Sequence, residues 1–288
     1  MPFVPVSGDD AAQRLLALPA NVCVYGPPGT RKTTLTAQAF VDAARGVNRS
    51  WFIQCEDGAL KPVGALASRG MPVPSYAVDP QTGEPKTVKC WADYVEQMSW
   101  LFELRRAGQC PFTAVVMDTV STFTEYLHRE FSAPGGMGAV PGLPAQNSKN
   151  KYAIWIRLRD ALFTVREWSR AIGLHSVLIA HEVTPGQRTE EGVIESWIGG
   201  PLLQPKTMIE RYHGSIDTIL RVARLPSVPG NAGGDVFFTG GTEWPTGYGM
   251  PPADMAKYRT KNRDGINLAV VPADLRAYLL SRQPPYPI

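Results

Sequence analysis

The sequence has few cysteines, and their arrangement suggests neither a metal site nor a disulfide framework. Its 288 residues contain four cysteines, without a CxxC pair and without a histidine at metal-ligand spacing. We expect them to be reduced and to act as small core residues. The four are Cys23, Cys55, Cys90 and Cys110.

The chain also has no long apolar segment and little net charge. No stretch approaches the length of a membrane span, and Asp9, Asp10 and Arg14 precede any apolar run that could act as a signal peptide. The formal net charge of +3 is too small to predict nucleic-acid binding by itself. We therefore expect a soluble, cytoplasmic protein without a membrane partner.

Glycine and proline are plentiful, with 27 and 26 residues, which predicts many tight turns and irregular loops. The length allows one large α/β domain or two small ones. We find neither an internal repeat nor a clear linker. The sequence predicts an N-terminal segment over 1–20 that is a candidate oligomer contact, a single core over 21–271, and a C-terminal tail over 272–288.

Strands and helices are expected to alternate along the core. Apolar runs at 21–25 and 51–54 predict buried strands, and the helical pattern over 32–44 between them completes a parallel βαβ unit. The Pro/Gly-rich segment 60–90 is predicted to be an irregular insertion with one short strand. Further buried strands are expected at 114–117 and 176–180, and helices at 92–107, before residue 130, and at 154–172.

The segments after residue 216 alternate in hydrophobicity and carry hairpin turn signals, which predict antiparallel strands at one edge. The predicted fold class is therefore α/β, with a mostly parallel central sheet flanked by helices and antiparallel strands at the C-terminal edge.

A phosphate-binding loop is predicted at 26–34, GPPGTRKTT, which fits GxxxxxK[ST] between a strand and a helix. Backbone N–H groups would surround the β-phosphate, Lys32 would contact the β- and γ-phosphates, and Thr33 would bind Mg²⁺. A glycine-rich turn before an unrelated helix is the alternative. The predicted nucleotide-binding residues are Gly26, Pro27, Pro28, Gly29, Thr30, Arg31, Lys32, Thr33 and Thr34.

Arg31 departs from the usual pattern, in which glycine precedes the lysine. A side chain there crowds the loop, and a positive φ is costly for arginine. Its charge would not repel ATP, so the sequence favours binding over fast turnover. The strand 114–117 ends in Asp118, which would lie beside the loop and contact Mg²⁺ directly or through water.

In their order along the chain, these motifs resemble those of the RecA-type ATPases, which include RecA, RadA, the KaiC and DnaB groups and small phage recombinases. Glu56, in WFIQCEDGAL, stands where the family has its catalytic glutamate. His181, in VLIAHEV, stands at the position of the γ-phosphate sensor. The segment TKNRDG resembles the KNR motif, which implies that Lys261 and Arg263 reach a neighbouring subunit's γ-phosphate.

Each of these residues also has a simpler interpretation. Glu56 could be a solvated loop acid, His181 a hydrogen-bonded residue at a strand end, and the two basic residues an exposed turn. Their shared order and context favour the joint interpretation. Under that interpretation the catalytic residues are Lys32, Glu56, Asp118 and His181, and the metal ligands are Thr33 and Asp118.

The resemblance also suggests a role for two irregular stretches, 131–150 and 183–206, which fall where the family has DNA-binding loops. Single-strand binding needs cations for phosphates and rings for base stacking. Neither stretch is strongly basic, so a lid or an interface loop is the alternative. The candidate DNA-binding residues are Phe131, Lys149, Lys151, Arg188 and Trp197.

The compact core most resembles the small phage ATPases of the Sak type, which are single-strand annealing recombinases. This resemblance implies ATP and Mg²⁺, single-stranded DNA, and self-association in a ring or filament. A single-strand-binding protein is a further candidate partner, and a phage-encoded protein would act in the bacterial host cytoplasm. The alternatives are a helicase-like replication accessory ATPase and a weakly hydrolysing nucleotide switch that binds a protein partner.

Overall fold

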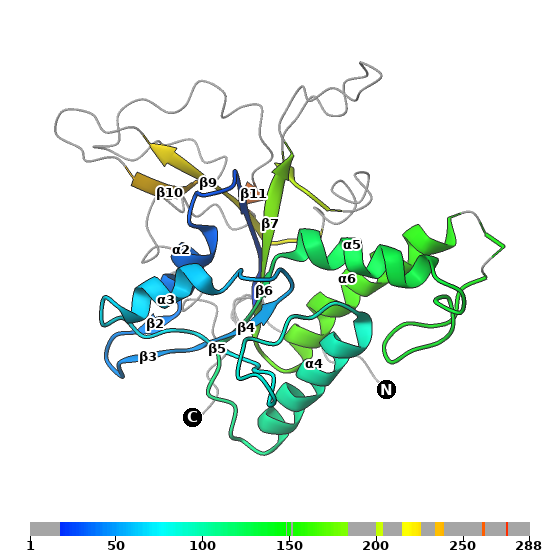
Figure 1. Cartoon of the computed structure of the whole chain (residues 1–288), viewed down its shortest axis with the longest axis horizontal. Coiled ribbons are helices and arrows are strands. Elements are labelled where there is room, and N and C mark those ends of the chain that lie inside the picture. Colours follow the sequence, from blue (N-terminus) through cyan, green and yellow to red (C-terminus); the bar gives the residue numbers. More distant parts are fainter. Residues whose placement is uncertain are drawn as a thin grey trace, which may run out of the picture.

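The computed structural model describes residues 18–147, 149–150, 152–183, 200–203, 215–225, 234–238, 261–262 and 275. Within this part of the chain, one twisted sheet runs through the molecule and helices cover both of its faces (Figure 1). No helix in the described residues is both long and apolar enough to cross a membrane.

The sheet has the strand order β10-β9-β1-β7-β6-β4-β5, with β8 beside β7 and β11 beside β9. The pairs within the run from β9 to β5 are parallel, whereas β10 and β11 are antiparallel to β9. The predicted fold class, with antiparallel strands at the C-terminal edge, is confirmed. The strands are β1 (Asn21–Gly26), β4 (Ser50–Gln54), β5 (Ser75–Tyr76), β6 (Ala114–Asp118), β7 (His175–Val183), β8 (Gly200–Pro201), β9 (Thr218–Leu225), β10 (Gly234–Phe238) and β11 (Lys261–Asn262).

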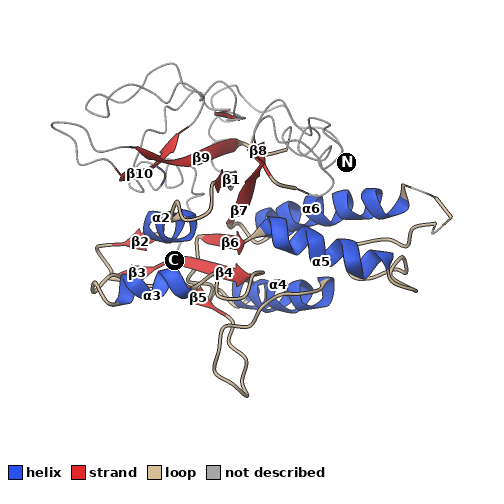
Figure 2. Ribbon diagram, turned by 45° about the horizontal axis from the view of Figure 1, so that its top comes forward, coloured by secondary structure: helices blue, strands red, loops and turns tan. Residues whose placement is uncertain are grey.

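Two sets of helices enclose the sheet (Figure 2). The short helices α2 (Lys32–Ala39) and α3 (Lys61–Ala67) lie on one face. The longer helices α4 (Trp91–Arg106), α5 (Val120–Ser132) and α6 (Ala153–Ala171) lie on the other. Strand β1 shows why both faces are filled: Val22 and Val24 join the core beneath α2, and Cys23 and Tyr25 join the core beneath α4–α6.

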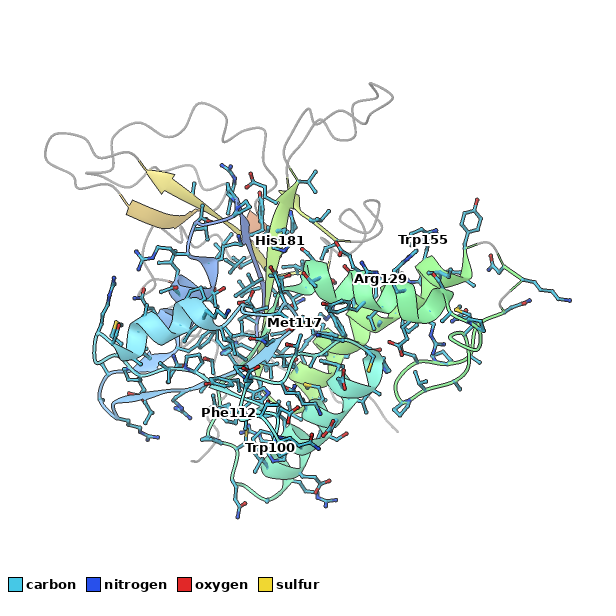
Figure 3. All side chains as sticks on the ribbon, viewed as in Figure 1. Trp100, Phe112, Met117, Arg129, Trp155 and His181 are labelled. Carbon is cyan, nitrogen blue, oxygen red and sulfur yellow. The ribbon has the colours of Figure 1, made fainter. Side chains whose placement is uncertain are left out.

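An aromatic cluster closes the edge of the sheet at which β4 and β6 begin. Trp51 lies between Trp100 and Phe112, with ring centroids 4.6 and 5.4 Å away, and its indole N–H donates to Gln97. Figure 3 shows Trp100 and Phe112 at this edge and His181 at the opposite edge. Met117 lies between the two edges. Asp118, at the end of β6, also lies at that opposite edge.

Two local predictions were wrong. The helix predicted over 32–44 ends at Ala39 and is followed by a hairpin of β2 (Val41–Asp42) and β3 (Val47–Asn48). The Asn48 amide donates to the carbonyl of Ala37, so the hairpin itself caps the helix end. Segment 60–90 contains the predicted short strand, β5, but also the helix α3, which the sequence did not indicate because the helix has only two buried apolar residues, Val63 and Leu66.

Candidate nucleotide-binding site

The predicted site residues meet because four neighbouring parallel strands end at one edge of the sheet. Gly26 on β1 pairs in register with His181 on β7, and Asp118 on β6 pairs with both Ile179 of β7 and Gln54 of β4. Glu56 follows β4 by two residues. The carboxyl ends of parallel strands are where α/β proteins bind ligands.

The loop between β1 and α2 holds a buried lysine. Lys32 is 8% exposed, and its ammonium donates to the carbonyl oxygens of Gly26 and Pro27, both at 2.9 Å. Burial lowers the pKa of Lys32, an effect that the nearby Asp118 carboxylate opposes. Gly26 is required by packing, since a Cβ there would lie 2.4 Å from the carbonyl oxygen of Val222. The loop therefore encloses its cation in backbone acceptors that phosphate oxygens could replace.

Thr33 and Asp118 lie side by side at the start of α2. The Thr33 hydroxyl donates to Asp118 Oδ2 at 2.6 Å. Asp118 is 1% exposed, and burial raises its pKa to about 7, against the lowering effects of the Thr33 hydrogen bond and the Lys32 charge. These two oxygens suit Mg²⁺, which prefers a few protein oxygens together with water and phosphate. In the described residues, no group of three His, Cys, Asp or Glu side chains gathers to hold a metal.

Glu56 and His181 form a second pair at this edge. His181 Nε2 lies 3.2 Å from Glu56 Oε2, and both side chains are partly exposed, at 36% and 44%. Ser121 at the start of α5 fixes the backbone here: its hydroxyl accepts from the His181 N–H and donates to the Leu202 carbonyl. The sequence analysis did not identify Ser121, because its partners are 60 and 81 residues away in the chain.

Arg31 adopts the left-handed conformation that glycine favours. Its φ is 59° and its ψ 27°, and it is the N-cap residue of α2 without a side-chain cap. Among the described residues it is the sole non-glycine residue with a positive φ. Such a conformation is about 1 kcal/mol less favourable for a side chain with a Cβ than for glycine. The strain foreseen for this position is present.

Thr119 follows Asp118 and begins α5 as its N-cap, with the hydroxyl oxygen accepting from the Thr122 N–H. The peptide bond between Asp118 and Thr119 is cis. The arrangement groups Lys32, Thr33 and Asp118 beside the Glu56–His181 pair.

A buried ion pair next to this site was not predicted. Arg221 on β9 makes two hydrogen bonds to Glu182, the residue after His181, at 2.6 and 3.1 Å. The two side chains are only 7% and 5% exposed. No local pattern marks the pair, because the two residues are 39 positions apart on strands that the sequence does not order.

The candidate DNA-binding residues are placed in part. Phe131 is 2% exposed and lies beneath the Arg157 guanidinium, 4.9 Å from the ring centroid, so the prediction that it stacks on a base is corrected: its ring belongs to the core. Lys149 is exposed. Lys261 starts β11 and pairs with Ile219 of β9. The DNA-binding candidates Lys151, Arg188 and Trp197 lie outside the described residues. Arg263, which is predicted together with Lys261 to act on a neighbouring subunit, also lies outside them.

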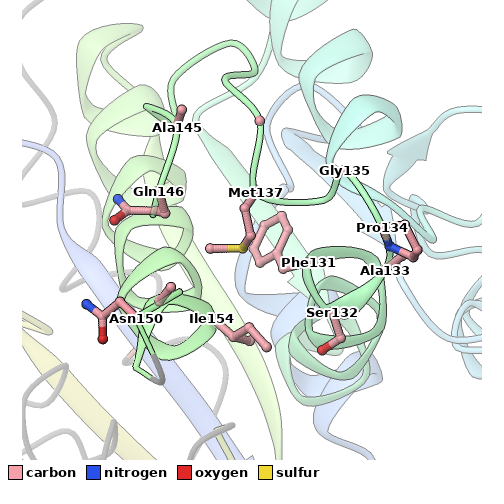
Figure 4. Close-up of a pocket in the computed structure, with 12 residues that line it drawn as sticks. Phe131, Ser132, Ala133, Pro134, Gly135, Met137, Ala145, Gln146, Asn150 and Ile154 are labelled. Carbon is pink, nitrogen blue, oxygen red and sulfur yellow. The ribbon is translucent and has the colours of Figure 1, made fainter. Parts of the chain in front are cut away.

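Segment 131–150 encloses an open cavity together with the start of α6 (Figure 4). Its volume is about 800 Å³, and Phe131, Met137 and Ile154 form its apolar wall. Arg157, 1% exposed, holds the segment in place by donating to the carbonyls of Met137, Gly138 and Pro144. The described part of this stretch is thus an ordered loop tied to α6.

No protein-family model matches the sequence, and no curated protein matches it either. One similar solved structure is the crystal structure of the RadB recombinase, at 19% identity and a TM-score of 0.36, covering 79% of this chain and 91% of that chain. The fold assignment therefore rests on the strand order and register described above.

Proposed function

We propose that this protein binds ATP with Mg²⁺, hydrolyses it, and acts as a RecA-like recombination protein on single-stranded DNA. The observation that carries the proposal is the convergence of Lys32, Thr33 and Asp118 with the Glu56–His181 pair at one edge of a parallel sheet. Residues 21–271 would form the ATPase core.

Binding would use groups that already face one another. The Lys32 ammonium would exchange its two carbonyl acceptors for β- and γ-phosphate oxygens. Thr33 and Asp118 would hold Mg²⁺, which neutralises charge on the phosphates when bound. The N-terminus of α2 points its backbone N–H groups and its dipole at the same place.

Hydrolysis would use Glu56 as the general base. A glutamate accepts a proton from the attacking water most effectively when its carboxylate is not occupied by another donor. In the structure His181 Nε2 lies 3.2 Å from that carboxylate. A γ-phosphate that attracts the imidazole would separate the pair, leaving Glu56 for water and His181 for phosphate.

The DNA and assembly parts of the proposal rest on the order of the motifs. The predicted loops follow β6 and β7, two of the strands that carry the nucleotide residues, and Lys261 lies on a strand that pairs with β9. From the resemblance of TKNRDG to the KNR motif, we infer a ring or filament in which Lys261 and Arg263 complete a neighbour's site.

A second candidate function is a nucleotide-dependent switch that hydrolyses slowly and binds a protein partner. The φ of 59° at Arg31 favours it, because a strained arginine inside the phosphate loop would oppose the loop geometry needed for rapid chemistry. The two candidates share the nucleotide site and differ in turnover and in the partner.

The test measures ATP binding, ATP hydrolysis and single-stranded DNA affinity for the wild type, Lys32→Ala and the exposed-lysine control Lys61→Ala. We expect Lys32→Ala to weaken ATP binding about 100-fold and Lys61→Ala to behave as wild type. ATP should change the DNA affinity of the wild type and of Lys61→Ala, but not that of Lys32→Ala. ATP binding that does not depend on Lys32 would refute the nucleotide site, and DNA affinity unchanged by ATP would refute the recombination role.

A further inference from the structure

Residues 85–89 run directly beside the segment that carries Glu56. Thr87 forms a parallel bridge with Gln54, the last residue of β4, and the Val88 N–H donates to the Gln54 carbonyl at 2.7 Å. Residues 77–86 form a hairpin closed by the bridge between Val78 and Pro85. The loop after β4 is therefore bordered by a backbone that is itself hydrogen-bonded.

The Thr87 hydroxyl joins the two segments. It accepts a hydrogen bond from the Gln54 amide at 2.8 Å and donates one to Asp57 Oδ1 at 2.7 Å. Gln54 is 5% exposed, and its amide oxygen also accepts from the Leu60 N–H, on the far side of the loop. A single hydroxyl thus connects the residues before and after Glu56.

Asp57 is anchored although it is exposed. Its side chain is 72% exposed, yet Thr87 and Lys89 bind its two carboxylate oxygens. These hydrogen bonds, first that of Thr87 and then that of Lys89, lower the pKa of Asp57, so the carboxylate stays ionised. Contacts of so exposed a group contribute little to stability.

We propose that Thr87 is a positioning residue for Glu56: by holding Gln54 and Asp57 it fixes the loop in which Glu56 faces His181. The inference rests on the proposed role of Glu56 in hydrolysis. Misplacing a reacting group by about 1 Å lowers a rate about 100-fold. Thr87 should therefore affect the chemical step far more than folding or nucleotide affinity.

The experiment compares Thr87→Val, which keeps the shape and removes both hydrogen bonds, with Thr87→Ser, which keeps them. We expect Thr87→Val to lower kcat at least 10-fold with an ATP Kd within twofold of wild type. Its melting temperature should fall by no more than a few degrees, because the buried Gln54 amide loses one acceptor. Thr87→Ser should match the wild type. Amide hydrogen exchange over 55–60 should accelerate in the valine variant and not in the serine variant.

A second arm combines Thr87→Val with Glu56→Gln in one chain. If Thr87 acts through Glu56, Thr87→Val should add no further loss to that of Glu56→Gln. Three outcomes would each overturn the positioning role. They are additive losses of kcat in the double variant, an unaffected kcat in Thr87→Val, and a parallel fall of ATP affinity and melting temperature in Thr87→Val. The proposed function would instead be refuted if the wild type did not hydrolyse ATP, or if Glu56→Gln hydrolysed it as fast as the wild type. In that case, amide hydrogen exchange that Thr87→Val leaves unchanged would overturn the loop-holding role of Thr87 as well.

Discussion

Two consecutive residues at the end of β7 serve different faces of the sheet. His181 points to the side of α2, where it meets Glu56 and both partners are more than one third exposed. Glu182 points to the side of α4–α6, where it binds Arg221. Each of these two side chains is less than 10% exposed. Strand alternation thus separates the two contacts by a single residue.

The difference separates contacts that a ligand could replace from a contact that is closed to solvent. On the α2 face, polar groups have partners that a ligand could replace: backbone carbonyls for Lys32, a hydroxyl for Asp118 and a half-exposed acid for His181. On the other face, the buried Glu182 carboxylate is paired with the Arg221 guanidinium. Changes on the buried face should therefore alter the free energy of unfolding most, and changes on the α2 face should alter chemistry.

The largest expected effect on stability is that of Arg221→Met. It leaves the Glu182 carboxylate buried without its counter-charge, which should lower the free energy of unfolding by about 3–5 kcal/mol in urea titrations. Lys86→Met, which breaks the exposed pair with Glu96, is the control and should change it by less than about 1 kcal/mol. Equal effects of the two substitutions would remove the contrast between buried and exposed pairs.

A smaller effect should appear as a pH dependence of the metal-free chain. Burial raises the pKa of Asp118 from 3.8 to about 7, so between these pH values the folded chain holds a proton that the unfolded chain has released. Stability then falls as pH rises through that window. From pH 5 to pH 8 we expect the wild type to lose roughly 2–3 kcal/mol relative to Asp118→Asn, whose amide oxygen still accepts the Thr33 hydroxyl.

Urea unfolding at each pH in the presence of a chelator measures this difference. Parallel stability profiles for the wild type and Asp118→Asn would show that the carboxyl does not titrate in this range. They would also show that the buried Asp118 carboxylate is stabilised by its neighbours as fully as Glu182 is by Arg221. The two faces of the sheet would then not differ in this respect.

Arg31→Gly should have the next smaller effect and the opposite sign. Glycine adopts a φ of 59° without the penalty of a Cβ, so thermal or urea unfolding should show a gain of about 0.5–1 kcal/mol. Arg45→Gly, at a residue without positive φ, is the matched control and should not stabilise. If Arg31→Gly also raises turnover from near zero, the switch function is favoured over the recombinase.

The smallest effect on stability is expected for His181→Ala. The pair with Glu56 is exposed, so the free energy of unfolding should change by less than about 0.5 kcal/mol. ATP hydrolysis should nevertheless fall at least 10-fold, since the imidazole is proposed to contact the γ-phosphate. A large loss of stability without a loss of turnover would reverse the roles assigned to the two faces.

Much of the fold could be predicted because its signals are local. The buried strands β1, β4, β6 and β7 are short apolar runs, and α4 and α6 follow the 3.6-residue period. The helix α3 and the hairpin β2–β3 were missed because their conformation depends on packing: Val63 and Leu66 fill the core beneath α2, and Asn48 binds the end of that helix.

The sequence by itself determined the glycine-rich loop between β1 and α2, the Asp118 strand end and the α/β class, since each depends on residues adjacent in the chain. Tertiary structure alone decided that Phe131 is buried, that Arg221 neutralises Glu182, and that Thr87 holds Asp57. These contacts join residues 30 or more positions apart or depend on how a loop packs. Such pairings follow from strand order and register, which no local pattern of residues encodes.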